Sequence, residues 1–277
     1  MSVETTNKNK QRVMDYMSGA RYKGTYKNGK RHGFGRLVLN NGSFYEGEFA
    51  DNEKHGKGIY KWVNGSVFEG HFANDQPNGK GKLISNNGDI YDGNWVNGKR
   101  HGDGKTIWNN GNTYEGKYNN NEKHGFGIHI WKTNRSKYTG DWQHNIPHGQ
   151  GRYEYENGDV YEGDFKEGVR NGRGQLTYAN GDVYEGEYVN DLKHGNGKFL
   201  WTNGDCYHGQ FVKGVPDGMG EYIWALKHST IITEPIVDGK PPLSEKKSSR
   251  KSSSRHSPKR QLSNNDFVPY SGQSETF

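Results

Sequence analysis

Hydrophobic and polar positions recur at a fixed interval along most of the chain. An aromatic residue, a glycine two positions later and a second aromatic two positions after that occur nine times. The interval between copies is 23 residues, except for 24 between Tyr114 and Tyr138. Since strand side chains alternate between two faces, this spacing puts both aromatics and the glycine on one face of a β-strand. The aromatics are Tyr22, Tyr26, Tyr45, Phe49, Phe68, Phe72, Tyr91, Trp95, Tyr114, Tyr118, Tyr138, Trp142, Tyr161, Phe165, Tyr184, Tyr188, Tyr207 and Phe211.

The second half of each copy predicts a partner strand. It carries Gly-x-Gly, from Gly33 and Gly35 to Gly218 and Gly220, after a polar turn such as residues 51–56. An Asn-Gly step such as Asn41-Gly42 then leads to the next copy, and Asn-Gly suits the positive φ angles of a type I′ turn. We therefore expect nine hairpins joined by type I′ turns. Rings lying on strand glycines would replace a second layer.

These residues and their spacing resemble the MORN (membrane occupation and recognition nexus) repeat family over about residues 20–225. The resemblance implies an all-β protein, a single-layer antiparallel β-meander of nine 23-residue hairpins. It also implies a scaffold or recognition surface, and it implies no chemistry. Among proteins built of such repeats, the layout is similar to that of radial spoke head proteins.

The chain divides by composition into four parts. We expect an N-terminal cap or extension over 1–19, the nine repeats over 20–225, a C-terminal cap over 226–239 and a disordered basic Ser-rich tail over 240–277. Caps are expected because terminal repeats expose unpaired sheet edges.

Composition narrows the fold classes further. Only 29% of the residues are hydrophobic, and Trp, Tyr and Phe (7, 18 and 11) supply nearly half of that share. Aliphatic side chains are too scarce for a doubly wound α/β fold, a TIM barrel or a helix bundle. No stretch approaches the roughly 18 apolar residues of a membrane span, and the first 19 residues lack the apolar segment of a secretory signal. Cytoplasmic residence is expected, with Cys206 filling a site that valine occupies in other copies.

A second period of three repeats overlies the first. One turn position holds arginine, lysine and proline in succession. Two explanations stay open: triplication of a three-repeat block, or a match between triplets and sheet twist, which would give every third turn the same environment. The residues are Arg31, Lys54, Pro77, Arg100, Lys123, Pro147, Arg170, Lys193 and Pro216.

No pattern of an enzyme or cofactor site is present. The sequence has no P-loop, H-E-x-x-H, paired C-x-x-C or EF-hand motif, so we expect no catalytic residue, cofactor, metal or small-molecule substrate. Recurrent carboxylates such as Glu46 and Glu69 are expected to pair with lysines and arginines across strands. Six histidines recur at one repeat position about 10 Å apart, too far to share a metal. They are either polar turn residues or a pH-sensitive or ligand-contacting ladder: His32, His55, His101, His124, His148 and His194.

Two surfaces are candidates for binding. The 18 aromatic residues either cover the glycines of their own sheet or also form a groove for a partner helix or peptide. The tail over 240–277 holds eight Lys and Arg against three Asp and Glu. It is a solubilising tail, a phosphorylation platform at Ser257 and Ser263, or a binder of anionic surfaces. The basic residues of that last interpretation are Lys246, Lys247, Arg250, Lys251, Arg255, Lys259 and Arg260.

The functional prediction is a non-enzymatic scaffold. We expect a cytoskeletal component of cilia or flagella, located in the axoneme, whose partners are protein subunits of that assembly. The alternative is a peripheral membrane adaptor that binds phosphoinositides or other acidic lipids through the repeats and the basic tail. Nucleic acid is not an expected partner, and the sequence leaves homo-oligomer formation open.

Overall fold

The computed structural model describes residues 11–225 and 231–236, and this part of the chain is built of antiparallel strands without a helix. It separates into two compact units, residues 1–135 with 142–145 and residues 136–141 with 146–277. Strand β12 (Lys137–Gln143) contributes residues to both.

Each remaining strand falls within one unit. Unit 1 contains β1 (Arg12–Asp15), β2 (Arg21–Lys27), β3 (Lys30–Val38), β4 (Phe44–Ala50), β5 (Glu53–Lys61), β6 (Val67–Ala73), β7 (Gln76–Ile84), β8 (Ile90–Val96), β9 (Lys99–Ile107), β10 (Thr113–Asn119) and β11 (Glu122–Ile130). Unit 2 contains β13 (Ile146–Glu154), β14 (Val160–Lys166), β15 (Val169–Thr177), β16 (Val183–Val189), β17 (Leu192–Leu200), β18 (Cys206–Val212), β19 (Val215–Ile223) and β20 (Ile231–Ile236).

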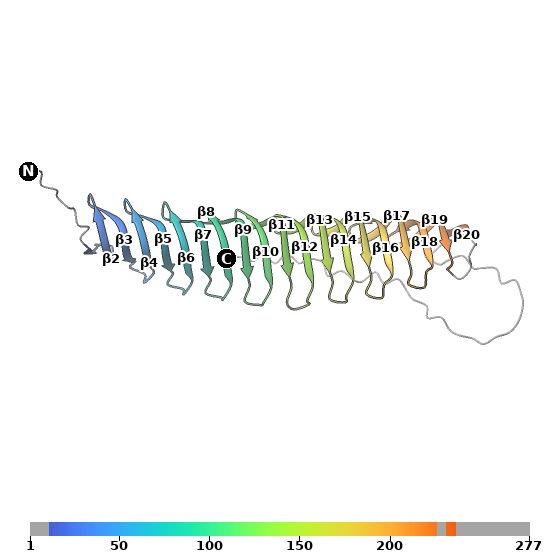
Figure 1. Cartoon of the computed structure of the whole chain (residues 1–277), viewed down its shortest axis with the longest axis horizontal. Helices are drawn as coiled ribbons and strands as arrows, with labels where there is room; N and C mark the ends of the chain where they lie inside the picture. The colour runs from blue at the N-terminus through green and yellow to red at the C-terminus, as the bar shows by residue number, and fades with distance from the viewer. Residues whose placement is uncertain (1–10, 226–230, 237–277) are drawn as a thin grey trace, which may run out of the picture. The chain divides into compact units, whose positions relative to one another are not determined.

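Within each unit, every strand pairs with the strands before and after it in sequence, as Figure 1 shows. Strands β2 to β19 form the nine predicted hairpins, which confirms the all-β meander. The flanks add one strand each: β1 pairs with β2, and β20 pairs with β19. The first and last repeats therefore each have a further strand hydrogen-bonded to them.

The predicted type I′ turns at the Asn-Gly steps are wrong. At residues 39–43 only Gly42 has a positive φ, of 88°. Its N–H donates to the Leu39 oxygen (3.0 Å), and the Leu39 N–H donates to the Ser43 oxygen (2.8 Å). This is a three-residue loop with glycine at the left-handed position. The two-residue turns lie at the other end of each hairpin, where Asp51 (φ 48°) and Asn52 (φ 80°) are both left-handed.

Glycine pairs let the aromatic rings lie flat on the sheet. Gly47 of β4 faces Gly58 of β5, and the Tyr45 ring crosses both. A Cβ added at Gly47 would lie 2.6 Å from the Tyr45 hydroxyl, and one at Gly58 would overlap that hydroxyl and its ring. The Tyr45 hydroxyl donates to the Glu48 carbonyl oxygen at 2.9 Å. The expected packing of rings on glycines is thus confirmed.

The rings also contact one another in a continuous ladder within each unit. Tyr45 meets Phe49 of its own strand at 5.1 Å and Phe72 of the next repeat at 4.9 Å, both edge to face. The same alternation continues in unit 2, where Tyr161 meets Phe165 and Tyr188 at 5.1 Å each. Edge-to-face pairs are favourable beyond their buried area. This aromatic ladder is the core of each unit.

Candidate interaction surface

The aromatic ladder is buried by the side chains above it. Seventeen of its 18 rings are buried, and only Tyr26 is half-exposed. The expected covering of strand glycines is what the structure shows for these residues. Partner binding on this face stays a prediction, and burial leaves little of each ring for a partner to touch.

The turn position that holds Arg, Lys or Pro places its cations over the aromatic ladder. The Arg31 guanidinium is 5.3 Å from the Phe49 ring centre, and the Lys193 ammonium lies 5.0–5.2 Å from the rings of Tyr178, Tyr184 and Phe199. Lys123 and Lys193 are 4% and 8% exposed. Rings with a negative face replace part of the water that these cations lose on burial.

The three-repeat period follows from hydrogen bonds between neighbouring turns. The Arg31 N–H donates to the Asn52 side chain of the next repeat at 2.8 Å, and the Lys54 N–H donates to Asp75 at 2.9 Å. Pro77 has no N–H to donate, and Gly98, which has no acceptor side chain, occupies the facing turn position. Pro147 and Gly168 repeat this pairing. The turns at Pro77 and Pro147 therefore meet the same environment, and the three arginine turns each meet an Asn or Asp.

His129, which is not one of the six predicted histidines, packs against the same group of rings and cations. His129 stacks on Trp131 at 4.2 Å and on Trp108 at 5.2 Å. Burial, and then the charge of Lys123, lower its pKa to about 2. His129 is thus neutral, and its Nδ1, 3.1 Å from the Lys123 ammonium, accepts a hydrogen bond.

A second set of rings, beside the Asn-Gly loops, was not predicted. Each of these rings comes directly after the second strand of a hairpin. Four of them lie two residues before the asparagine of an Asn-Gly step: Trp62, Tyr155, Tyr178 and Trp201. Trp62 contacts Tyr60 at 4.6 Å, and Trp201 contacts Phe199 at 4.6 Å. We call the half-exposed members the loop-side rings: Trp62, Trp131, Tyr155, Tyr178, Trp201 and Trp224. An aromatic residue two positions before the loop Asn-Gly was visible in five of the seven copies that have this step, and it would have identified four of the six rings.

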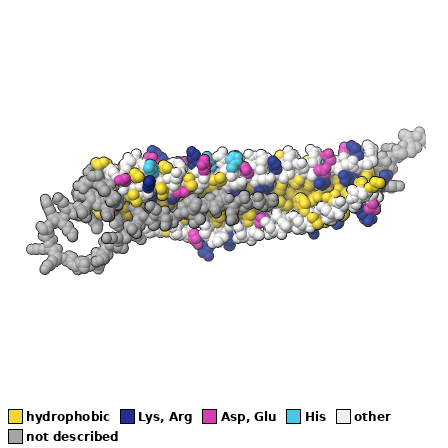
Figure 2. Space-filling view, turned by 180° about the vertical axis from the view of Figure 1, so that it is seen from behind, with side chains coloured by type: hydrophobic (Ala, Val, Ile, Leu, Met, Phe, Trp, Pro, Cys, Tyr) yellow, Lys and Arg dark blue, Asp and Glu magenta, His cyan; other side chains and the backbone are white. Residues whose placement is uncertain are grey.

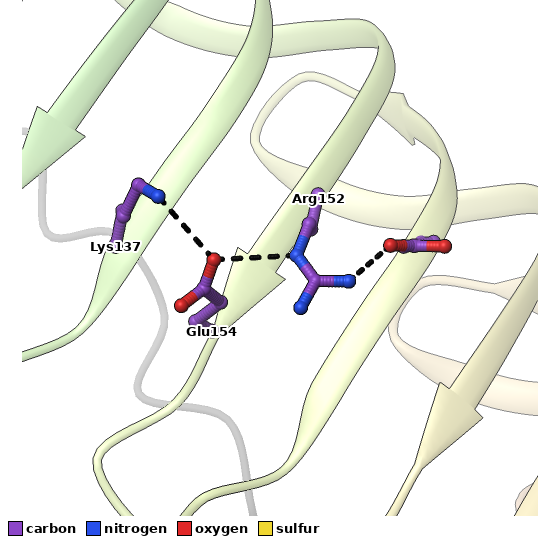
Figure 3. Close-up of polar contacts among 4 residues, drawn as sticks. Lys137, Arg152 and Glu154 are labelled. Carbon is purple, nitrogen blue, oxygen red and sulfur yellow. Dashed lines mark hydrogen bonds and ion pairs between the residues drawn. The ribbon is translucent and has the colours of Figure 1, made fainter.

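The opposite face of each hairpin is polar. Lys137 pairs with Glu154 at 3.4 Å, Arg152 pairs with Glu154 at 3.2 Å, and Arg152 also pairs with Glu162 (Figure 3). The hydrogen bond that the Arg152 guanidinium donates to the Glu162 carboxylate is the main cause of the raised pKa of Arg152. Figure 2 shows acidic and basic side chains interspersed on the surface, beside a stretch of hydrophobic ones. Cross-strand pairing of the carboxylates is thus observed, in pairs such as Arg36–Glu46 as well.

One row of the polar face lies at β-bulges, where the strand register shifts, for example between Gly47 and Glu48. A glycine with positive φ opens space opposite the residue that precedes the second aromatic. The Glu48 carboxylate enters that space at Gly56 and accepts the Lys57 N–H at 3.0 Å. Asp164 accepts the Arg173 N–H at 2.6 Å in the same way. We call these positions the bulge row; its described members are Thr25, Glu48, His71, Asn94, Lys117, Asp141, Asp164, Glu187 and Gln210.

Other predicted residues are placed as follows. Cys206 is 8% exposed between Leu200 and Ile223, and burial raises its pKa, as suits an apolar filler. His32 lies 3.8 Å from Asp51, at the rim of a turn. No described set of three or more His, Cys, Asp or Glu could hold a metal ion. Where the chain is described, no helix could cross a membrane. The seven basic tail residues, Ser257 and Ser263 lie outside the described residues.

Comparison with known proteins agrees with this geometry. The family model of the MORN repeat matches nine segments: residues 22–44, 45–67, 68–90, 91–113, 114–134, 138–160, 161–183, 184–206 and 207–225. The chain belongs to the MORN repeat family. MORN repeats form protein-interaction or membrane-binding modules and are typically non-enzymatic. No curated relative matches the chain.

Solved structures that match the chain include the TCP domain of SAS-4 (dCPAP) from Drosophila melanogaster, in complex with a proline-rich motif of Ana2. It is 9% identical, with a TM-score of 0.39, over 64% of this chain and 90% of that one. The TCP10 domain of CPAP from Danio rerio is 11% identical, with a TM-score of 0.40, over 73% of this chain and 97% of that one.

Proposed function

We propose that this MORN protein is a non-enzymatic scaffold of a ciliary or flagellar axoneme, which docks neighbouring protein subunits through its repeats. The observation that supports the proposal is the recurrence of half-exposed rings at equivalent positions on rigid hairpins. Tryptophan and tyrosine are the side chains that most often dominate protein interfaces. The loop-side rings are therefore the contacts that we assign to partners, next to the buried ladder.

The test uses the tagged full chain in ciliated cells, extracted with mild detergent. Retention with the insoluble axoneme supports the scaffold, and release with the membrane fraction contradicts it. The double variant Trp62→Ser with Trp201→Ser should lose retention. Its matched control is Val63→Ser, because Val63 is 68% exposed and adjacent to Trp62 but is not a ring. Equal loss in both would reject the assignment of the loop-side rings.

A second function, binding to acidic lipid, is supported by the charge of residues 240–277. Each Lys or Arg near an anionic membrane contributes about 1 kcal/mol. Co-sedimentation with vesicles that contain phosphoinositide should then require Lys246, Lys247, Arg250 and Lys251. Binding that survives their replacement by glutamine would reject this function.

A further inference from the structure

The bulge row has a different charge in the two units. In unit 2 it begins with three carboxylates in consecutive repeats, Asp141, Asp164 and Glu187. In unit 1 it is mixed, with Glu48 the single acidic member and Lys117 a basic one. No Lys or Arg in the described part of the chain forms an ion pair with the three carboxylates of unit 2. The bulge row of unit 2 therefore carries three consecutive negative charges, with Arg173 opposite Glu187 across β15 and β16 but not ion-paired with it.

This row borders a groove of about 760 Å³ on the sheet face of unit 2. Asp164, Glu187 and Glu221 line it, against Arg173 and Lys198. Along one side the sheet exposes aliphatic side chains, with Leu200 43% and Ile223 42% exposed. Within the described residues no element covers this face. A ligand that fits it has positive charge beside apolar groups.

A segment with that composition is attached to the same unit. Strand β20 ends at Ile236, which pairs with Gly218 of β19. The sequence after it places seven basic residues between Lys246 and Arg260, followed by Phe267, Val268 and Tyr270. Lys246 is ten residues beyond Ile236, a reach of up to about 33 Å. Strand β16 is four strand spacings, about 19 Å, from β20. The tether is therefore long enough, and it keeps the tail at a high local concentration.

We propose that residues 246–270 dock in cis on the polar face of unit 2. The Lys and Arg residues would meet the bulge-row carboxylates, and the apolar residues would meet the exposed aliphatic side chains. Carboxylates of successive repeats are about 10 Å apart, which three residues of extended chain span. In the tail, basic residues or pairs recur every three to five positions, for example Lys247, Arg250 and Arg255.

Phosphorylation of the tail would weaken its docking on unit 2. A phosphate on Ser257 or Ser263 adds about two negative charges to the segment, next to the carboxylates. Repulsion would then weaken the docking of the tail. The docked tail would also withhold its basic residues from acidic membranes.

Carbodiimide cross-linking of the full-length chain tests the docking, because this reagent joins only an amine and a carboxylate in direct contact. Products are mapped by mass spectrometry in a mixture of isotopically light and heavy protein, which separates links within a chain from links between chains. The expected result is intrachain links from Lys246, Lys247, Lys251 or Lys259 to Asp164, Glu187 or Glu221. Their yield should fall about tenfold when salt rises from about 0.05 to 0.5 M.

The variant Asp141→Asn, Asp164→Asn, Glu187→Gln removes the charge and keeps the oxygens that accept the backbone N–H groups. It should lose the link to Glu221 as well, and the Ser257→Asp, Ser263→Asp chain should lose the links in the same way. The control Glu48→Gln makes the same change at the same register position in unit 1. It should leave the links intact. Urea midpoints establish that each variant is folded.

Three results would overturn the proposal: links spread equally over the carboxylates of unit 1, links found only between chains, or a yield unchanged in the triple variant. Equal binding of acidic vesicles by the full-length wild type and the full-length triple variant would also overturn it. That result would favour the lipid function alone. The docking does not depend on the axonemal function. Loss of axoneme retention with intact cross-links would reject only the latter.

Discussion

At the scale of single residues, contact between a glycine and a ring determines whether a repeat can form. Gly58 faces Gly47 under the Tyr45 ring, and Lys57 points to the opposite, solvated face. A side chain is therefore accepted at position 57 and excluded at position 58.

We predict that Gly58→Ala lowers the free energy of unfolding by about 3 kcal/mol, since its Cβ would displace the Tyr45 ring from the ladder. Lys57→Ala should change it by less than about 0.5 kcal/mol. Urea unfolding followed by tryptophan fluorescence measures both. Similar losses for the two variants would contradict the packing of the ring on this glycine.

A second residue-scale prediction concerns His129. Its folded-state pKa of about 2 lies below the ordinary value of 6.5, so below pH 6.5 the unfolded chain binds a proton that the folded chain excludes. Its stabilising effect is complete above pH 6.5 and decreases as the pH falls. Phenylalanine occupies the equivalent site beneath Lys193 as Phe199, which makes His129→Phe a matched variant.

Between pH 6 and 4 the wild type should lose about 2 kcal/mol more stability than His129→Phe. Urea midpoints at several pH values measure the difference. Parallel curves for the two proteins would show that His129 is protonated in the fold.

At the scale of the hairpin, the three-repeat period describes which residues face each other in the turns of neighbouring repeats. A residue with an N–H at the Arg, Lys or Pro position is matched by Asn or Asp in the next turn, and proline is matched by glycine. The exception is Lys193, which faces Gly214. Gly98 has φ +75°, and an added Cβ would meet only the Gln76 side-chain oxygen at 3.7 Å, an ordinary contact, so asparagine, which tolerates this conformation, fits there.

The double variant Pro77→Arg, Gly98→Asn should recreate the contact between Arg31 and Asn52. We expect the two changes to couple favourably by about 1 kcal/mol in a double-mutant cycle. The pair Pro147→Arg, Gly168→Asn repeats the experiment in unit 2. Additive effects in both units would mean that the period has no basis in these hydrogen bonds.

At the scale of the whole molecule, the same phenol environment recurs in both units. Burial raises the pKa of Tyr22 to about 12 and raises that of Tyr91, Tyr161 and Tyr184 further. These tyrosines stabilise the fold fully below pH 10, and that contribution is lost as the pH rises through the folded-state values.

The tyrosines of the ladder should therefore ionise together with unfolding. Phenolate absorbance at 295 nm should lag behind that of free tyrosine above pH 10 and then rise steeply as the near-ultraviolet circular dichroism disappears. A gradual titration near pH 10, with the dichroism intact, would mean that the rings are solvated.

The sequence by itself determined the strands, the hairpins and the faces, because alternation along a strand and glycine opposite a ring act over a few residues. Tertiary structure decided what depends on the neighbouring repeat. Asn-Gly suits two loop types, and the structure has the three-residue loop. The ladder rings are buried because the next repeat and its cation cover them, while the loop-side rings stay half-exposed. The acidic bulge row exists because pairing aligns Asp164 with Glu187, which are 23 residues apart in sequence. Burial and charge at a surface are sums over such neighbours, and a pattern within one repeat does not contain them.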